Sequence, residues 1–168
     1  MARTQFNPID QTATYSVAAV NTVSATNTAS DVSFVTLTVP GNENLGACYS
    51  AKAYGIGYGA LGTLITFWVS VNGVKVASLP LTLANAFISP NPMLWTLDAM
   101  ITLGGTGTTA SVRVDGEMLW NANVNTIHAS GSTSINQTAS WTITLGCTIG
   151  VASASNTVTC NQALIRRF

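Results

Sequence analysis

From Asp31 onward, apolar and polar residues alternate with a period of two over most of the chain, and Gly, Pro and Asn separate the alternating runs. Such alternation is typical of β-strands that bury one face. No window combines a helical apolar period with capping signals, so the pattern predicts an all-β fold. The eight predicted strands are residues 32–39, 46–58, 63–71, 74–83, 93–103, 109–119, 134–149 and 157–168.

The strongest local signal is the dipeptide Asn72-Gly73, which lies between two of these runs. Asn and Gly accept the positive φ angles that a two-residue type I′ turn requires. The sequence therefore predicts a hairpin formed by residues 63–71 and 74–83.

Three positions depart from simple alternation. A bulge is expected in the first strand after Phe34. Asp115-Gly116 is either a second tight turn or a bulge inside one longer strand, and we favour the bulge. Residues 121–132 are polar and include His128, and we interpret them as a loop.

Eight antiparallel strands fit an aligned sandwich, a closed barrel or a double-sheet jelly roll. One clear hairpin among longer connections favours chain crossings between two sheets. We therefore predict an eight-stranded antiparallel jelly-roll sandwich over residues 30–168, preceded by an extended N-terminal arm over residues 1–29.

Charged residues are rare: only 7% of the 168 residues are Asp, Glu, Lys or Arg, and the formal net charge is zero. Soluble domains contain about 25%. Binding to nucleic acid needs clustered Lys and Arg, which this chain lacks, so we expect no nucleic-acid partner. A surface with few charges favours association, so we expect much of it to be covered by partners.

The arm is rich in Thr, Ser, Ala and Asn, with scattered larger side chains. It is equally compatible with a loose terminus and with a segment that lies along a neighbouring subunit. For the second case the expected partner contacts are Phe6, Ile9, Tyr15 and Val17. No apolar run resembles a secretory signal or a membrane-spanning helix, so we expect synthesis in a cytoplasm and no membrane partner.

Residues suited to chemistry are sparse. His128 is the only histidine, and Cys48, Cys147 and Cys160 are scattered, which favours buried thiols over a disulfide framework or a zinc site. We expect no catalytic residue, cofactor or metal, and no enzyme activity. Acids in predicted strands could form a pair for glycoside hydrolysis, but solvent-facing or ion-paired roles are favoured; these acids are Asp98, Asp115 and Glu117.

Aromatic residues offer one further possibility. The four tryptophans lie in predicted strands, where filling the core is their expected role; they are Trp68, Trp95, Trp120 and Trp141. Tyr54 and Tyr58 flank glycines near a strand end, where exposure is expected. If the chain binds a carbohydrate or another partner, these two tyrosines are the candidate contacts.

Three segments stand out as motifs: Leu94-Trp95-Thr96-Leu97 leading to Gly104-Gly105-Thr106-Gly107-Thr108, the run Trp141-Thr142-Ile143-Thr144, and the stretch from Ala154 to Ala163. Through these segments the chain resembles structural proteins of tailed bacteriophages. The resemblance implies a jelly-roll virion component of the head decoration, or cement, type. It transfers no functional residue, because these motifs are structural.

The leading hypothesis is therefore a virion protein that binds the major capsid protein as a homotrimer and stabilises the head, with the capsid surface as its location. The alternative is a tail-associated domain that binds a receptor or carbohydrate. Low charge suits the first hypothesis, because few ions need to be desolvated when subunits meet.

Overall fold

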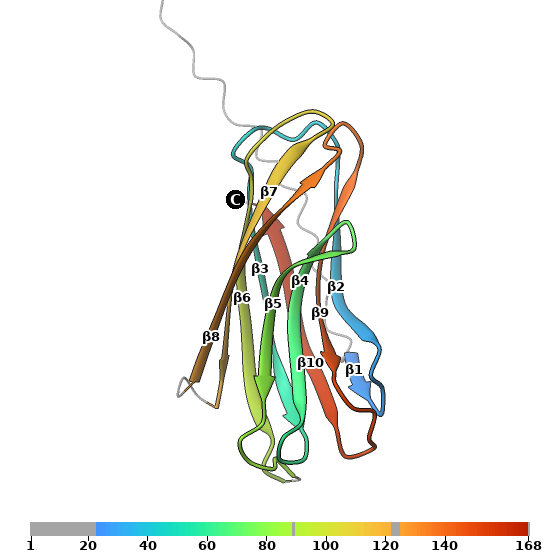
Figure 1. Cartoon of the computed structure of the whole chain (residues 1–168). Coiled ribbons are helices and arrows are strands. Elements are labelled where there is room, and N and C mark those ends of the chain that lie inside the picture. The colour runs from blue at the N-terminus through green and yellow to red at the C-terminus, as the bar shows by residue number, and fades with distance from the viewer. Residues whose placement is uncertain (1–22, 89, 122–124, 168) are drawn as a thin grey trace, which may run out of the picture.

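The computed structural model describes residues 23–88, 90–121 and 125–167, which form two antiparallel sheets packed face to face (Figure 1). The predicted all-β sandwich is thus confirmed. The strands are β1 (Val23–Thr26), β2 (Asp31–Val39), β3 (Cys48–Tyr58), β4 (Leu64–Val71), β5 (Val74–Thr82), β6 (Met93–Leu103), β7 (Ala110–Trp120), β8 (Asn125–Ile135), β9 (Trp141–Ile149) and β10 (Thr157–Arg167).

The strand order is that of a jelly roll with two added strands. One sheet has the order β2-β9-β4-β5, and the other begins β1-β10-β3-β6. The chain crosses repeatedly between these sheets, as in the paired Greek keys of a jelly roll. β7 and β8 then extend the second sheet beyond β6, so that this sheet has six strands.

Strand β8 corrects the prediction that residues 121–132 form a loop. This strand pairs along its whole length with β7, and His128 lies within it. Its even-numbered residues are mostly Ser and Thr, and the opposite side carries the small residues Ala129 and Gly131. The apolar alternation is therefore too weak to mark a strand, although the backbone pairing is regular.

Two other boundaries differ from the prediction. The expected strand 134–149 is interrupted after Ile135, where Gln137 turns inward and donates a hydrogen bond from Nε2 to the backbone oxygen of Glu43 at 2.7 Å. The expected bulge at Asp115-Gly116 is absent, because β7 keeps an unbroken register with both of its neighbours. β1, within the predicted arm, pairs with β10.

The predicted hairpin and the first bulge are confirmed. Asn72 and Gly73 have φ angles of 49° and 78°, both positive, as a type I′ turn requires. The turn joins β4 to β5. In β2 the register with β9 shifts between Ser33 and Val35, so the bulged Phe34 and the following valine both become buried.

The core lies between the sheets and is organised by three rings from different strands. Trp95 lies 5.4 Å from Phe34 and 4.7 Å from Phe67, measured between ring centroids. Its indole nitrogen donates to the backbone oxygen of Ile56 at 3.1 Å, so the polar atom of the ring is satisfied. Removing a ring of this size from a packed core costs about 3–5 kcal/mol.

Trp68 is also buried, but on the outer face of the four-stranded sheet. Its ring lies over Gly146 of β9, where a side chain would meet it: a Cβ placed on Gly146 would lie 2.4 Å from the ring. Thr148 accepts a hydrogen bond from the indole nitrogen at 3.1 Å, and Lys75 Nζ lies 5.2 Å from the ring centroid. The expected core role of tryptophan thus holds for Trp95 and Trp141, whereas Trp68 covers the sheet from outside.

Candidate functional site

Charged side chains gather on the outer face of the six-stranded sheet, although the chain has few of them. The described part contains ten Asp, Glu, Lys and Arg residues, and six of them alternate outward from β3, β6, β7 and β10. These six are Lys52, Asp98, Arg113, Asp115, Glu117 and Arg166. The only histidine of the chain lies on the same face, which makes this face the candidate for recognition.

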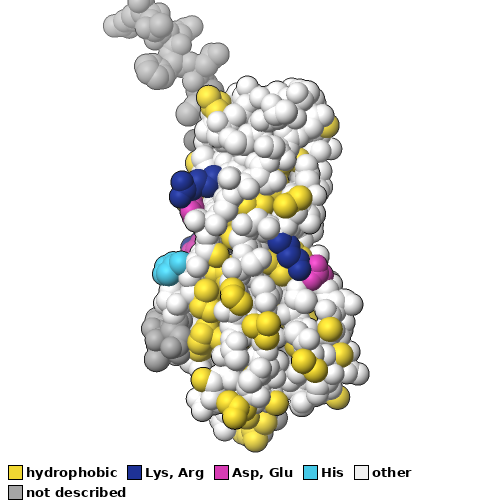
Figure 2. All heavy atoms as spheres, viewed as in Figure 1, with side chains coloured by type: hydrophobic (Ala, Val, Ile, Leu, Met, Phe, Trp, Pro, Cys, Tyr) yellow, Lys and Arg dark blue, Asp and Glu magenta, His cyan; other side chains and the backbone are white. Residues whose placement is uncertain are grey.

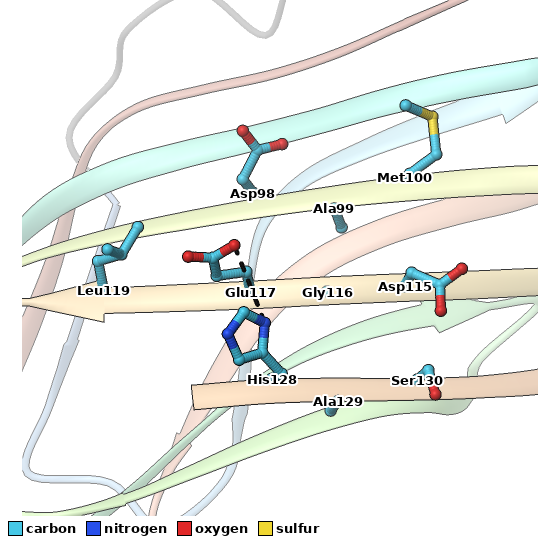
Figure 3. A pocket seen from close by; sticks show the side chains of 10 residues that line it. All are labelled: Asp98, Ala99, Met100, Asp115, Gly116, Glu117, Leu119, His128, Ala129 and Ser130. Carbon is cyan, nitrogen blue, oxygen red and sulfur yellow. Dashed lines mark ion pairs between the residues drawn. The ribbon is translucent and has the colours of Figure 1, made fainter. Parts of the chain in front are cut away.

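Four of the polar side chains form a row across adjacent strands. The register aligns Lys52 of β3, Asp98 of β6, Glu117 of β7 and His128 of β8. Lys52 Nζ lies 2.5 Å from Asp98 Oδ2, and His128 Nδ1 lies 3.9 Å from Glu117 Oε2. Figure 3 shows the side chains of Asp98, Glu117 and His128 next to one another on three neighbouring strands.

A hollow of about 530 Å³ lies beside this row. One wall is the row Asp98, Glu117 and His128, and the other is the next row of outward side chains, formed by Met100, Asp115 and Ser130. The floor between the walls is the backbone of Ala99, Gly116 and Ala129, which are aligned with one another. Leu119 completes the lining (Figure 3).

The floor is backbone because the side chains of Ala99 and Ala129 point toward the second sheet and Gly116 has none. A Cβ built on Gly116 would face the second sheet, with Leu79 Cδ1 at 3.6 Å and Ala77 Cβ at 3.8 Å. At this point the six-stranded sheet packs on β5, where Leu79 and Ala77 face Gly116. The result is a rigid, mixed polar and apolar depression built on strands rather than on loops.

Tyr54 lies one row away from this hollow. It is aligned with Thr96, which is itself aligned with Leu119 of the lining. The side chain is exposed, with 49% of the residue accessible, and its hydroxyl donates a hydrogen bond to Gln162 Oε1 at 2.7 Å. That bond fixes the ring, so Tyr54 presents an oriented aromatic surface next to the polar rows.

The other expected contacts have different outcomes. Tyr58 is half-buried at the end of β3. Phe6, Ile9, Tyr15 and Val17 lie outside the described residues, so their role stays a prediction. The rows across β6, β7 and β8 could not be read from the sequence, because they depend on strand register.

Two ion pairs hold the walls in place. Arg113 donates to both carboxylate oxygens of Asp115, from Nε at 2.9 Å and from Nη2 at 3.1 Å. This bidentate pairing raises the pKa of Arg113 further above its usual value. Together with the Lys52–Asp98 pair, it orients two of the three carboxylates at the hollow.

Two arrangements used in catalysis are missing from the described residues of this face. Among the described residues, the His128 side chain faces Glu117 at 3.9 Å, and no hydroxyl group is hydrogen-bonded to it, as a serine nucleophile would be. Within the same residues, no group of three or more His, Cys, Asp or Glu is placed to hold a metal ion. No helix in the described ranges is long and apolar enough to span a membrane.

The three cysteines are free thiols. Cys147 and Cys160 are buried, as expected, and burial raises the pKa of Cys147 to about 12 and that of Cys160 to about 11. Cys48 is half-buried on the outer face of β3. The buried pair is therefore suited to packing, because the thiolate is the reactive form.

A second distinctive surface is one end of the sandwich, formed by loops 59–63, 83–92 and 150–156. Backbone hydrogen bonds connect these loops: Gly62 donates to Leu83, and Gly150 donates to Leu64. None of the three loops contains an Asp, Glu, Lys or Arg. Exposed aliphatic side chains gather there instead, as Figure 2 shows; they are Leu61, Leu64, Ile88, Leu94 and Val151. We refer to these five residues as the apolar end.

Fold and hollow together define a β-sandwich with a candidate binding face on its larger sheet. No protein-family model matches the chain, and no curated protein matches its sequence. Among solved structures, the chain is distantly similar to the C-terminal domain of EclA, a sugar-binding protein. The TM-score is 0.37 at 12% sequence identity, with 88% of this chain and 79% of that chain covered.

Proposed function

We propose that this protein is a non-enzymatic carbohydrate-binding domain and that it binds its ligand on the outer face of the six-stranded sheet. The observation that carries the proposal is the hollow over β6, β7 and β8, with the exposed ring of Tyr54 beside it. It combines hydrogen-bonding side chains with apolar ones on rigid strands, which is the composition of a small-molecule site.

Each part of this face has a counterpart in a sugar. Carboxylate oxygens of Asp98 and Glu117 accept hydrogen bonds from sugar hydroxyls, and the hydroxyl of Ser130 can donate and accept. Met100 and Leu119 offer apolar contact to the C–H surface of a sugar ring. An aromatic ring such as that of Tyr54 packs flat against the same kind of surface.

The test is binding of the full chain to a panel of neutral, amino and acidic oligosaccharides, measured by isothermal titration calorimetry. Tyr54→Ala removes the ring and is expected to weaken binding about ten-fold, which is roughly 1.4 kcal/mol. Tyr54→Phe is the matched control: it keeps the ring, loses the bond to Gln162 and should bind within a few-fold of the parent. If no oligosaccharide on the panel binds, the proposal is wrong.

A second function, attachment to a virus capsid as a decoration protein, is favoured by the apolar end. Five exposed aliphatic side chains, on loops without charge or on the strand ends next to them, can be buried against a partner without desolvating ions. This supports the proposal of a homotrimer that binds the major capsid protein at the capsid surface. The test is the solution mass by light scattering, where about three times 17.4 kDa is expected, followed by co-sedimentation with undecorated capsids.

The two functions use different surfaces and can be separated by mutation. Leu61→Ser and Ile88→Ser should reduce capsid occupancy and leave sugar binding unchanged, because both residues lie at the apolar end. Tyr54→Ala should do the reverse. Full occupancy by the double serine variant would rule out attachment through the apolar end.

A further inference from the structure

We infer that residues 16–22 continue β1 along the open edge of β10 and so cover this edge of the six-stranded sheet within the same chain. The inference concerns a surface that neither proposed function uses, and it names the occupant of that surface. It is drawn from the unequal lengths of β1 and β10, from the direction in which the chain enters β1, and from the sequence of the segment.

β10 is paired unevenly on its two sides. On one side it pairs with β3 from Thr157 to Arg167, which is the whole strand. On the other side β1 has only four residues and pairs with residues 157–160 (Figure 1). Among the described residues, no strand pairs with this side of β10 over residues 161–167. An open edge of this kind presents unpaired N–H and C=O groups and is a template for another strand.

The opposite edge of the same sheet is closed in a different way. β8 is the last strand there, and β5 of the other sheet lies against it. A side chain at Gly131 of β8 would collide with the backbone oxygen of Val76 in β5. β2 lies near β10, but its backbone pairs with β9. The second half of β10 is therefore the part of this sheet's edges that has no described neighbour.

The chain enters β1 from the direction of this open edge. β1 and β10 are antiparallel, with Val23 opposite Cys160 and Thr26 opposite Thr157. The residues just before Val23 can therefore continue beside residues 161–167 without a turn. In the sequence 22 residues precede Val23, and only about seven are needed to reach the end of β10, because a paired strand advances by one residue for each residue of its neighbour.

The sequence of the segment suits a strand at this place. Residues 11–30 contain no charged residue and no proline. Val23 and Ala25 of β1 face the core, so alternation leaves two possible inward pairs in the middle of the segment, depending on how it passes the bulge at Asn161. These pairs are Val17 with Ala19, or Ala18 with Val20. Either register turns a valine and an alanine toward the buried side of β10.

Covering the edge has a consequence for association. An uncovered edge can pair with the same edge of a second copy, and proteins avoid this by covering or shortening their edge strands. The segment thus limits such pairing, and Val17 is a contact within the chain rather than one with a neighbouring subunit. Of the contacts expected in the arm, Phe6, Ile9 and Tyr15 stay available to a partner.

The experiment is amide hydrogen exchange of the full chain, measured residue by residue by NMR, on the parent and on two single variants, Ala18→Pro and Ala19→Pro. Neighbouring amides of a strand point to opposite sides, so only one of the two prolines removes a hydrogen bond to β10. In that variant the amides of residues 162–167 that face away from β3 should exchange at least about ten-fold faster than in the parent, whereas the other variant should stay within about three-fold. Unchanged exchange in β7 shows that both variants are folded.

Three results would overturn the inference. Unchanged exchange in both variants would show that the segment does not pair with β10, and equal acceleration in both would show contact without strand pairing. Protection that is lost when the parent is diluted about 100-fold would show that the arm of a second copy covers the edge. Sedimentation velocity tests the consequence: the variant with faster exchange should self-associate more than the other, and equal behaviour of the two would mean that the segment does not limit edge pairing.

Discussion

Gly146→Ala provides a sharp test of how the outer face of the four-stranded sheet is packed. A Cβ at this position would lie 2.4 Å from two atoms of the Trp68 ring and 2.4 Å from the backbone oxygen of Val32. Both neighbours must move by several tenths of an ångström or more, and the oxygen belongs to the paired strand β2. Overpacking of this kind costs about 1–3 kcal/mol.

Moving the ring has a second cost. The indole of Trp68 would lose its hydrogen bond to Thr148, 3.1 Å long, which adds about 1 kcal/mol. The total expected destabilisation is about 2–4 kcal/mol, which corresponds to a decrease in Tm of roughly 5–15 °C for a domain of this size. Urea unfolding followed by tryptophan fluorescence measures it.

Gly116→Ala is the matched control for this experiment. Here the added Cβ would make ordinary contacts, with the nearest atom, Leu79 Cδ1, at 3.6 Å. Replacing a strand glycine reduces the entropy of the unfolded chain, so this variant should be as stable as the parent or more stable by up to about 1 kcal/mol. Equal stability of the two variants would refute the reasoning from contact distances.

Two further predictions concern titratable groups. Cys147 and Cys160 should resist alkylation by iodoacetamide at pH 8 in the native protein, because burial raises the pKa of Cys147 to about 12 and that of Cys160 to about 11. Mass spectrometry should detect alkylation of either thiol only after the protein is unfolded in urea. Rapid modification of Cys147 in the native protein would contradict its burial. Hydrogen bonds from Lys75 and Thr148, each 2.6 Å long, hold the pKa of Asp31 below its usual value, so Asp31→Asn should reduce stability by at most about 1 kcal/mol at pH 7. A carboxyl whose pKa is lowered by folding stabilises the fold at pH values above its unfolded-state pKa, near 4. The stability difference between the parent and Asp31→Asn should therefore shrink as the pH falls below 4. An equally large difference in urea unfolding at pH 3 would contradict this prediction.

The fold could be predicted from the sequence where local chemistry determines it. Asn72-Gly73 specifies its own turn, and the break in alternation at Phe34 marks a real bulge. Strand β8 was not predicted, because it is held to β7 by backbone hydrogen bonds and has few large apolar side chains that would mark it as a strand. Tertiary pairing of this kind leaves little trace in composition.

The candidate site could be predicted only in part. The sequence indicated Tyr54 as a candidate contact, whereas it favoured solvent-facing or ion-paired roles for Asp98 and Glu117 and a loop position for His128. The alignment of these residues depends on an unbroken register. A bulge at Asp115-Gly116, as the sequence analysis preferred, would have shifted Glu117 by one position relative to Asp98 and turned it toward the other face. The continuous strand β7 is therefore what brings the two carboxylates together.

The hollow also lies on different strands from the aromatic cluster of the core. Its residues come from β6 and from the two strands, β7 and β8, that extend the eight-stranded jelly roll. The core ring cluster of Phe34, Phe67 and Trp95 belongs to the jelly roll proper. Substitutions that test the candidate site can thus be made in β7 and β8 with little effect on that ring cluster.

The strand order has a consequence for the moment at which this protein can fold. The hydroxyls of Ser24 and Thr159, 2.9 Å apart on β1 and β10, are separated by 135 positions in the sequence. A ribosome working at about 5–20 residues per second needs roughly 7–27 s to cover that distance. For most of this interval β1 and β2 have been synthesised, but their partners β10 and β9 have not. The apolar side of β2, with Phe34 and Leu37, therefore stays open to chaperones until β9 has been synthesised, and refolding in vitro should be slow for a domain of this length.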